Sequence, residues 1–532
     1  MTVETADRAL AGIAPADWAP YAAIGTLLLV ELVAILALNG GMLVYTLDDP
    51  YIHLALAENI ARGHYGINLG EASAPSSSIL WPFLLVPFAG TAIHDEWPLV
   101  LNLASAFASI AVLQAILGRA MPPDAMPFRW LPPLVATLAA LLFNLVGLVF
   151  TGMEHSLQVL LALAVVLGLL VEAEERRVPW FLVAAIVIGP LVRYENLAVS
   201  AGALVHLALR GRIALAMVLG LATVGPLAAF SAVLRGLGLE WLPSSVLIKV
   251  DAAPADATLR DLVLAMARSL FASHGHHFRL ILLGFGVLFL WRGLRRGARP
   301  AARALAAAGA VMVAMHLAGG KYGWFGRYEP YVLISAAMLA IHLWRDPLSS
   351  WLRRQEPRGA LAAVLLPAVL IAPMTAMPTL LTPAAARNIH EQQYQMHRFV
   401  TEFAGGAAVA VNDLGWVGFR NDGYVLDLWG LGSVEAGARR LAGEPGWMDD
   451  MATRRGVRLA MLYEDWFPGQ IPAGWVRLGT LRLGHMRVTA ARSEVAFYAA
   501  NPAAAPELGA RLAAFARTLP EGVVFAADSP GG

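Results

Sequence analysis

The sequence predicts a mainly α-helical, polytopic membrane protein that ends in a smaller α/β domain outside the membrane. Of its 532 residues, 58% are hydrophobic and only 14% are charged, and the mean hydropathy is +0.60. These values lie outside the usual range of soluble globular proteins. Long apolar runs continue to about residue 378. The remaining residues, roughly 150 and enough for one domain, alternate between short strand-like and helix-like patterns.

The composition excludes several kinds of site. The chain contains no cysteine, so it forms no disulfide, iron–sulfur cluster or thiolate zinc site. A net charge of +1 gives no sign of nucleic-acid binding. The N-terminal stretch MTVETADRALAGIAPADWAP has acidic residues and no basic region before a cleavage site. We therefore expect no cleaved signal peptide, so the first apolar segment is retained.

The apolar runs predict about eleven membrane-spanning helices. Each run approaches the roughly 20 residues that a helix needs to cross about 30 Å of hydrocarbon. The expected spans are residues 21–46, 97–118, 130–150, 156–172, 180–195, 196–210, 213–234, 278–294, 302–319, 330–344 and 359–378.

One further apolar segment, SILWPFLLVPFAG at residues 78–90, is short and interrupted by Pro82 and Pro87, so we expect it to be re-entrant or interfacial. If it does not cross, all basic clusters fall on one side, which is the cytoplasm by the positive-inside rule. The N-terminus is then cytoplasmic and the C-terminal part lies outside. A tilted short span, compensated by another miscounted segment, is the alternative. The clusters are Arg119/Arg129, Arg176/Arg177, Arg210/Arg212, Arg292/Arg295/Arg296/Arg299 and Arg345/Arg353/Arg354/Arg358.

Two domains are expected from this pattern. Residues 1–378 form the transmembrane domain, with a long outer loop at 47–96, and residues 379–532 form the soluble domain. Short apolar runs in the second domain predict strands, and two longer amphipathic runs, NIHEQQYQMHRFVTEF and AAPELGARLAAFARTL, predict helices. The expected strands are AAVAVN, YVLDLWG, VRLAMLY, WVRLGTLRL and MRVTAAR.

Two adjacent carboxylates, Asp48 and Asp49, follow directly after the first apolar run, in the sequence YTLDDPY. Asp49 followed by Pro50 is typical of a helix start, where the carboxylate caps free N–H groups and proline occupies the first turn. Gly63 predicts the end of this helix. A capping role accounts for Asp49 but not for Asp48. Ionisable groups at a membrane boundary are candidates for function, so Asp48 is a candidate functional residue.

The stretch LDDPYIHLALAENIARGHYGINLGEASAPSSSILWPFLL resembles the first outer loop of the GT-C superfamily, the membrane-embedded glycosyltransferases that use polyprenyl-phosphate sugars. It is most similar to the branch that contains the terminal arabinofuranosyltransferases. The matching positions are Asp48, Asp49, Tyr51, Ile52, Asn59, Gly63, His64 and Trp81.

Weaker similarities to the same family follow in order along the chain. They are TGMEHSL at 151–157, VRYENLAV at 192–199, SSVLIKV at 244–250, GGKYGWFGRYEPYVL at 319–333 and VLDLWGLGS at 425–433. Three positions depart from the family pattern: Pro50 replaces a small residue, His53 replaces Ser or Phe, and Lys321 replaces an acidic residue. These departures affect the identity of the sugar and acceptor more than the class of reaction.

The resemblance implies a GT-C fold and an inverting glycosyltransferase, which moves a monosaccharide from a polyprenyl-phosphate carrier to a glycan, lipid or protein acceptor of the cell envelope. Such transfer needs a carboxylate base and cations for the departing phosphate. We expect Asp48 to be the base, because a helix N-terminus would lower the pKa of a capping Asp49; exchanged roles remain the alternative. The expected substrate-binding residues are His53, Asn59, His64, Glu154, Arg193, Glu195, Lys249, Lys321, Arg327 and Tyr328.

Each of these residues also has an ordinary structural explanation. A cation at a helix end often extends its charge to the membrane surface, Glu154 and Glu195 can pair with an arginine, and His53 can pair with a carboxylate. The aromatic residues near Tyr328 can border lipid headgroups. The histidines His274, His276 and His277 do not have the spacing of metal ligands on a helix, so no metal site is expected, although a requirement for a divalent cation is left open.

The expected location is a bacterial inner membrane, crossed many times. A transporter or flippase of lipid-linked sugars is the rival from another class, because it has similar hydrophobic architecture. A non-catalytic accessory subunit is a third alternative, and loss of the aspartate pair would be its expected sign.

Overall fold

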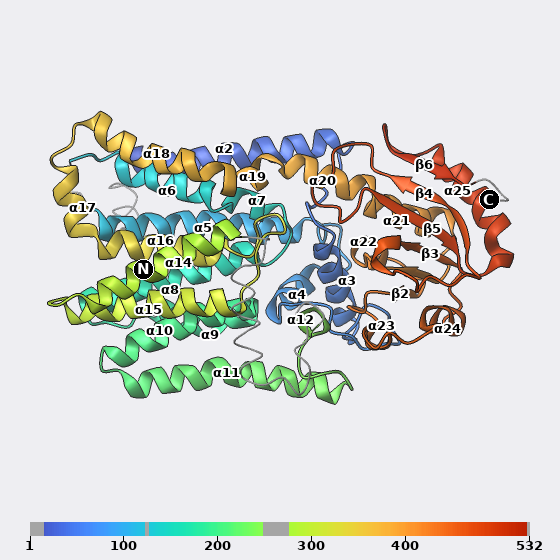
Figure 1. Ribbon diagram of the computed structural model, residues 1–532, viewed down its shortest axis with the longest axis horizontal. Helices are drawn as coiled ribbons and strands as arrows, with labels where there is room; N and C mark the ends of the chain where they lie inside the picture. The colour runs from blue at the N-terminus through green and yellow to red at the C-terminus, as the bar shows by residue number, and fades with distance from the viewer. Residues whose placement is uncertain (1–14, 123–126, 248–275, 529–532) are drawn as a thin grey trace.

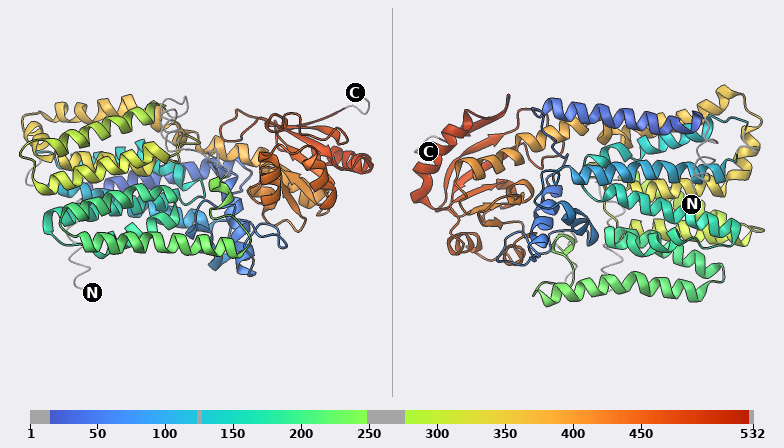
Figure 2. Two further views of the ribbon diagram at one scale, coloured as in Figure 1. Left: turned by 60° about the horizontal axis from the view of Figure 1, so that its bottom comes forward. Right: turned by 180° about the vertical axis from the view of Figure 1, so that it is seen from behind.

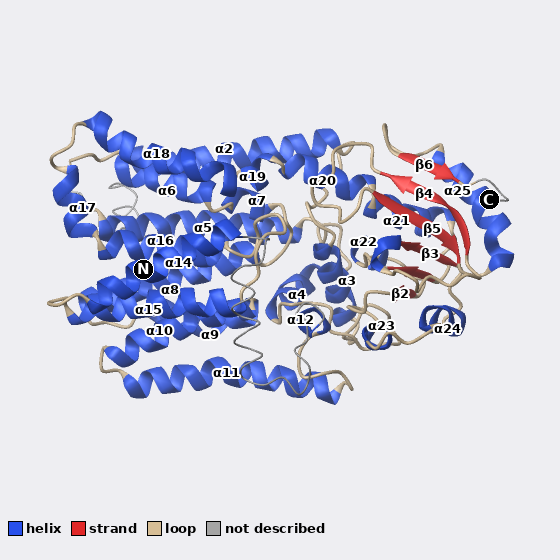
Figure 3. Ribbon diagram, in the orientation of Figure 1, coloured by secondary structure: helices blue, strands red, loops and turns tan. Residues whose placement is uncertain are grey.

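The computed structural model describes residues 15–122, 127–247 and 276–528, which form a helical bundle and a C-terminal domain built on a sheet. Figures 1 and 2 show the two parts end to end along the long axis of the molecule, with the bundle on the left of Figure 1 and the sheet on the right. Figure 3 places every described strand in the C-terminal part. The predicted fold class, a polytopic helical protein with a C-terminal α/β domain, is confirmed.

Each predicted span corresponds to a helix of the bundle. Within the described ranges, seven helices are long and apolar enough to cross a membrane: α2 (Pro15–Leu38), α5 (Trp97–Ala120), α8 (His155–Glu175), α11 (Ile213–Gly236), α14 (His276–Leu294), α15 (Pro300–Gly319) and α18 (Pro357–Thr375). Four shorter apolar helices accompany them: α6 (Leu131–Leu142), α9 (Trp180–Val192), α10 (Leu197–Leu209) and α16 (Pro330–Leu343). The protein is therefore a multi-pass membrane protein, and the count of eleven spans stays a prediction.

The first span was predicted too late in the chain. The expected range of 21–46 begins after the observed start of α2 at Pro15 and continues past its end at Leu38. Gly40 and Gly41 follow with φ of 66° and 89°, a left-handed backbone that glycine adopts without strain and that ends helices. Residues 42–47 then lead, without helix, to Asp48.

The segment at residues 78–90 forms only α4 (Leu80–Leu85) and the short 3₁₀ helix η1 (Val86–Phe88). Its beginning contacts the end of α9, where Ile79 N–H donates to the Leu191 carbonyl over 3.1 Å. Its end contacts the start of α5, where Trp97 Nε1 donates to the Leu84 carbonyl over 3.0 Å. Both contacts are at helix ends next to the C-terminal domain, so the segment lies at this end of the bundle (Figure 1).

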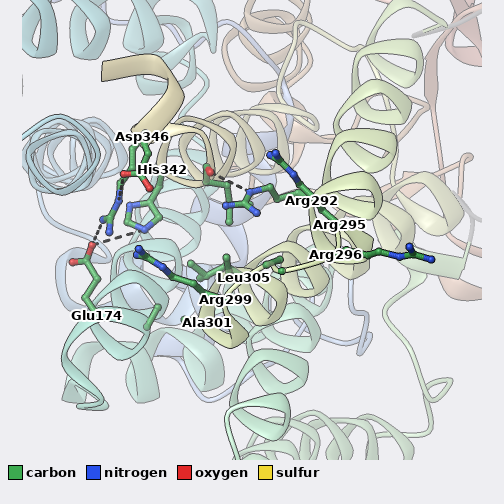
Figure 4. Close-up of a pocket in the computed structure, with 15 residues that line it drawn as sticks. Glu174, Arg292, Arg295, Arg296, Arg299, Ala301, Leu305, His342 and Asp346 are labelled. Carbon is green, nitrogen blue, oxygen red and sulfur yellow. Dashed lines mark hydrogen bonds and ion pairs between the residues drawn. The ribbon is translucent and has the colours of Figure 1, made fainter. Parts of the chain in front are cut away.

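The basic clusters gather at the opposite end of the bundle. Arg119 on α5 contacts Glu174 and Glu175 over 2.7 Å each, and Arg345, which begins α17 (Arg345–Leu352), also pairs with Glu174. Figure 4 shows this end, where a cavity of about 740 Å³ is lined by Glu174, Arg292, Arg295, Arg296, Arg299, His342, Arg345 and Asp346, among others. The clusters thus share one end of the bundle, and the membrane side that this end faces stays a prediction.

The C-terminal domain contains a six-stranded sheet with the order β2-β1-β3-β5-β4-β6. The central strand β1 pairs in parallel with β2 and β3, whereas β5 pairs antiparallel with β3 and β4, and β4 pairs antiparallel with β6. The strands are β1 (Val409–Val411), β2 (Val425–Asp427), β3 (Leu459–Leu462), β4 (Val476–Arg482), β5 (Glu494–Ala499) and β6 (Val524–Ala527).

Four of the five predicted strands are present, and the fifth, MRVTAAR at residues 486–492, is wrong. Asn388 accepts hydrogen bonds there from the N–H groups of Val488 and Thr489. These bonds hold the segment against α20 (Thr382–Glu391) in place of a sheet ladder. Strand β5 begins just after this segment, at Glu494. Neither β5 nor β6 was predicted.

The remaining helices connect and cover these parts. They are α3 (Asp49–Ala61), α7 (Leu145–Val149), η2 (Tyr194–Asn196), α12 (Ser244–Leu247), α19 (Met377–Leu380), α21 (Gln393–Arg398), the π-helical η3 (Phe399–Phe403), α22 (Gly415–Gly418), α23 (Val434–Leu441), α24 (Trp447–Arg454), η4 (Glu464–Trp466), η5 (Pro502–Ala504) and α25 (Ala505–Ala516). The two helical runs predicted in the C-terminal domain correspond to α20, α21 and η3, and to α25.

Candidate active site

Asp48 joins the first outer loop to the C-terminal domain. It precedes α3, but its carboxylate makes no capping hydrogen bond to that helix. The two oxygens instead accept hydrogen bonds from Gly415 N–H over 2.7 Å and Trp416 N–H over 2.9 Å. A Cβ at Gly415 would lie only 2.0 Å from the Asp48 carbonyl oxygen, so the contact requires glycine. The ring of Tyr51 stacks on Trp416 at a centroid distance of 3.9 Å and closes the same interface.

Asp49 has a different environment from the one expected. It is the first residue of α3, and its carboxylate forms an ion pair of 2.7 Å with Arg327. The side chain is 31% exposed, whereas that of Arg327 is only 3% exposed. The expectation that Asp49 caps its own helix is therefore wrong: Asp48 occupies the capping position, and Asp49 pairs with a cation of the bundle.

A cavity of about 340 Å³ lies between the bundle and the C-terminal domain. Three parts of the chain meet there: the first outer loop, the loop before α16, and the C-terminal domain. The polar and aromatic residues of the lining are Asp48, Asp49, Lys321, Tyr322, Trp324, Arg327, Tyr328, Gln393, Asn412, Asp413, Trp429, Trp466 and Thr489.

The loop before α16 has a strained backbone beside this cavity. Four successive residues, Gly323 to Gly326, have φ of 80°, 46°, 65° and 60°, and the two central ones, Trp324 and Phe325, are not glycine. A left-handed backbone costs of order 1–3 kcal/mol for each residue that is not glycine, and it persists only when the surrounding structure holds it. Asn144 Nδ2 donates to the carbonyls of Phe325 and Gly326 over 3.2 and 3.1 Å, and Glu329 accepts from Gly323 N–H.

A second cavity, of about 260 Å³, adjoins the first and is lined by residues at the ends of α9, α15 and α16. Lys321 and Tyr328 border both cavities. The second cavity adds the polar residues Arg193, Glu195, Ser245 and His316, together with the apolar Leu197, Ala198 and Met315. Lys321 thus lies where the two cavities meet.

Arg193 is already paired within the protein. Its guanidinium donates to Glu195 through two bonds of 2.6 and 3.0 Å, to Glu154 over 2.7 Å and to Ser77 Oγ over 2.9 Å. Burial opposes the charged form of Glu195, but the adjacent Arg193 outweighs it and lowers the pKa of Glu195 to about 2. One cation held by two carboxylates attracts a phosphate less than an unpaired cation does. Arg193 therefore links Ser77, Glu154 and Glu195 at this end of the bundle.

A third carboxylate, Asp413, was not predicted. Its Oδ2 accepts hydrogen bonds from Tyr463 OH over 2.6 Å and from Gln393 Nε2 over 2.8 Å. Burial raises the pKa of Asp413 against these two hydrogen bonds, and the Asp49 carboxylate adds to the increase. Burial and the neighbouring Asp413 likewise raise the pKa of Asp48, although two N–H groups oppose the shift. Burial thus favours the protonated forms of both Asp48 and Asp413.

Other predicted residues lie beside the cavities or away from them. His53 on α3 is buried, with its Nε2 3.8 Å from Glu154. Asn59 Nδ2 donates to the carbonyls of Gly66 and Ile67 over 2.8 Å each, and His64 contacts the Glu71 carbonyl over 3.1 Å. Asn59 and His64 therefore shape the outer loop and border neither cavity.

The predicted residue Lys249 lies outside the described residues, as does His274, which was considered and rejected as a metal ligand. Among the residues that the structure describes, no group of three or more histidine, aspartate or glutamate side chains is arranged to hold a metal ion.

The residues missed by sequence reasoning share one signal. Asn412 and Asp413 follow β1, Trp429 follows β2, and Trp466 follows β3. These three strands are parallel neighbours, and ligands of α/β sheets bind outside the carboxyl ends of such strands. Polar and aromatic residues directly after predicted strands were therefore the available clue.

Comparison with known proteins gives one family match and several structural ones. A family described as a domain of unknown function, DUF8728, matches residues 387–498, which run from α20 into β5. A comparison with curated protein sequences gave no match.

The structural matches include two proteins. The oligosaccharyltransferase of Archaeoglobus fulgidus, in a crystal structure with Zn and sulfate, is 12% identical at a TM-score of 0.46, covering 94% of this chain and 75% of that one. The same enzyme, AglB, with an inhibitory peptide and a dolichol-phosphate, is 10% identical at a TM-score of 0.45, covering 95% and 76%. Arabinofuranosyltransferase AftD from mycobacteria is 15% identical at a TM-score of 0.39, covering 90% of this chain and 41% of AftD.

By their names, both matched proteins transfer sugars. All of these TM-scores are below 0.5. The roles of individual residues are therefore argued from the contacts within this chain and from its sequence.

Proposed function

We propose that the protein is an inverting glycosyltransferase, which moves a monosaccharide from a polyprenyl-phosphate carrier to a hydroxyl group of an envelope glycan, lipid or protein. The observation that supports this most is the position of Asp49, which borders one cavity together with Lys321 and Arg327. A carboxylate beside two cations is the arrangement that transfer from a phosphate carrier needs.

Asp49 is the proposed general base. The acceptor oxygen attacks the anomeric carbon while the bond from that carbon to the phosphate oxygen breaks, and Asp49 takes the acceptor's proton. Attack from the side opposite the phosphate inverts the configuration. Asp48 is less suitable, because both of its oxygens accept backbone hydrogen bonds. General-base catalysis contributes about 10²–10⁴-fold to a rate.

Lys321 and Arg327 are the proposed ligands of the departing phosphate. Lys321 borders both cavities, and a lysine is a mobile point charge that can follow the phosphate as it leaves. Arg327 donates from Nη2 to Tyr328 OH over 2.9 Å, which fixes its guanidinium beside Asp49. The apolar residues of the second cavity suit the first isoprene units of the carrier.

The rival, a transporter, fits these positions less well. Transporters bind their cargo near the bilayer midplane, between related halves. Here both cavities lie at the ends of helices, next to the C-terminal domain, and the first is completed by residues of that domain. We propose that this end faces the outside of a bacterial inner membrane and that the basic end faces the cytoplasm.

The test uses the purified protein in lipid nanodiscs with polyprenyl-phosphate pentoses and hexoses as donors and envelope glycans with free hydroxyl groups as acceptors. Release of free polyprenyl phosphate, measured by mass spectrometry, is the expected result for at least one donor, and the anomeric configuration of the product is read by NMR. Movement of the donor across the bilayer of vesicles, with no release of polyprenyl phosphate, would favour the transporter instead.

A further inference from the structure

The edge of the sheet that faces the first cavity carries features of a sugar-binding site. Asn412 and Asp413 follow β1, Trp429 follows β2 and Trp466 ends η4 after β3, and all four line the cavity. Because β1 is parallel to both β2 and β3, the carboxyl ends of the three strands lie together. The bundle supplies none of these four residues.

Two buried amides, Asn412 on this edge and Gln393 at the start of the adjacent helix α21, have unused hydrogen-bonding groups. Asn412 is 5% exposed and Gln393 is 2% exposed, and among the described residues neither Asn412 Nδ2 nor Gln393 Oε1 has a hydrogen-bond partner. The other half of each amide is engaged, which fixes its orientation. Asn412 Oδ1 accepts from Tyr463 N–H over 2.8 Å, and Gln393 Nε2 donates to Asp413. Buried polar groups are normally paired, so a donor and an acceptor await a ligand here.

Two tryptophan rings complete the edge. The rings of Trp429 and Trp466 lie with centroids 4.6 Å apart. Asp427 holds the turn that carries Trp429, since its carboxylate accepts from Trp429 N–H over 2.9 Å and from Gly432 N–H over 2.7 Å. Aromatic walls with a few convergent polar groups are typical of small-ligand sites. A sugar offers hydroxyls that both donate and accept, and an apolar face of C–H groups that packs on such rings.

We propose that this edge of the C-terminal domain is the subsite for the acceptor and that it binds the terminal sugar of a neutral glycan. Asn412 Nδ2 donates to one hydroxyl, Gln393 Oε1 accepts from another, and Trp429 and Trp466 pack on the ring. The two amides, Asn412 and Gln393, are uncharged, and their unused groups match the uncharged hydroxyls of a neutral sugar. The assignment of this sugar as an acceptor rests on the proposed function, whereas the binding of the glycan does not.

The experiment measures glycan binding without any donor. Full-length protein in nanodiscs is titrated with neutral pentose and hexose oligosaccharides, and with acidic ones of equal length, by tryptophan fluorescence and calorimetry. Two variants are compared with the unchanged protein. Asn412→Asp keeps the oxygen that accepts from Tyr463 N–H but removes the N–H groups of the amide, which have no partner among the described residues. Trp466→Ala removes one of the two indole rings. Asn501→Ala and Trp180→Ala, at exposed positions, are the matched controls.

We expect at least one neutral glycan to bind, both variants to weaken it tenfold or more, and both controls to change it less than twofold. Donor binding should stay within twofold in every variant, and the melting temperature shows which variants are folded. Unchanged glycan affinity in either folded variant, or equal binding of acidic glycans, would overturn the proposal. If glycans bind as expected but no donor is ever consumed, the proposed enzymatic function fails while the subsite stands. If transfer occurs with an unchanged acceptor KM in both variants, the subsite fails alone.

Discussion

The carboxylate of Asp48 accepts hydrogen bonds from the backbone N–H groups of Gly415 and Trp416, which lie 367 and 368 residues further along the chain. This contact attaches the start of α3 to the C-terminal domain. Asp49 is the next residue, so the contact also determines where its carboxylate lies relative to Arg327. The geometry of the proposed base therefore depends on how the C-terminal domain packs against the outer loop.

The two aspartates should respond differently to the same substitution. Asp49→Asn cannot accept a proton, so we expect kcat to fall by about 10²–10⁴-fold with little change in melting temperature. Asp48→Asn keeps one acceptor oxygen but turns an amide N–H group toward a backbone N–H, which costs about 1–3 kcal/mol. We expect it to melt earlier and to retain partial turnover. Asp346→Asn, 78% exposed at the basic end, is the control. A dead but stable Asp48→Asn beside an active Asp49→Asn would restore the roles predicted from the sequence.

Gly415→Ala should separate the outer loop from the C-terminal domain. The added Cβ would lie 2.0 Å from the Asp48 carbonyl oxygen, closer than such atoms approach, so the backbone must move. We expect a lower melting temperature, faster proteolysis between the two parts and loss of turnover. Gly474→Ala is the control, because nothing lies within 4 Å of a Cβ there. If the two alanine variants behave alike, the interface is more adaptable than the structure indicates.

Lys321→Ala should lower the affinity for the sugar donor more than the affinity for the acceptor. A hydrogen bond to a charged group is worth about 1.5–3 kcal/mol, and we expect that loss in the affinity for a polyprenyl-phosphate sugar. Arg327→Ala should do the same and should also lower kcat, since it removes the partner of Asp49. Arg296→Ala, at the opposite end of the bundle, is the control. Unchanged donor affinity in both variants would move the phosphate site to Arg193 and Lys249.

The stability of the interface should fall as the pH rises. The pKa of Asp413 is raised in the folded protein, so folding retains a proton that the unfolded chain releases above its ordinary pKa near 4. This contribution is complete below that pKa and is lost as the pH rises through the raised one. Asp413→Asn has no proton to lose. We expect its melting temperature, relative to that of the unchanged protein, to increase between pH 4 and pH 8. A constant difference would show that Asp413 titrates normally.

The topology can be tested with two reporters. A tag after Gly532 and one in the loop at residues 119–129 should lie on opposite sides of the membrane, because the basic clusters and the C-terminal domain lie at opposite ends of the bundle (Figure 1). Accessibility of the two tags to a membrane-impermeant reagent measures this. If both tags are protected equally, the predicted odd number of spans between them is wrong, and so is the assignment of residues 78–90 as a segment that does not cross the membrane.

The sequence by itself determined the class of the protein and the end of the bundle where its unusual residues lie. The length of an apolar run can be read directly from neighbouring residues in the sequence. Each predicted span therefore corresponds to a helix. The helix end at Gly40 and Gly41 was a local signal too, and it was overlooked. The adjacent Asp48 and Asp49 were identified as functional candidates from their position alone.

Only the tertiary structure decided what each carboxylate does. The spacing of residues within YTLDDPY does not indicate a contact with Gly415. In the folded protein the Asp48 carboxylate accepts hydrogen bonds from the N–H groups of Gly415 and Trp416, whereas the Asp49 carboxylate pairs with Arg327. The sequence analysis likewise missed Asn412, Asp413, Trp429 and Trp466, because only the order of the strands in the sheet brings these residues together. Local patterns report on neighbours along the chain, whereas a cavity is made by segments that are distant along it and become neighbours only when the sheet packs against the loop.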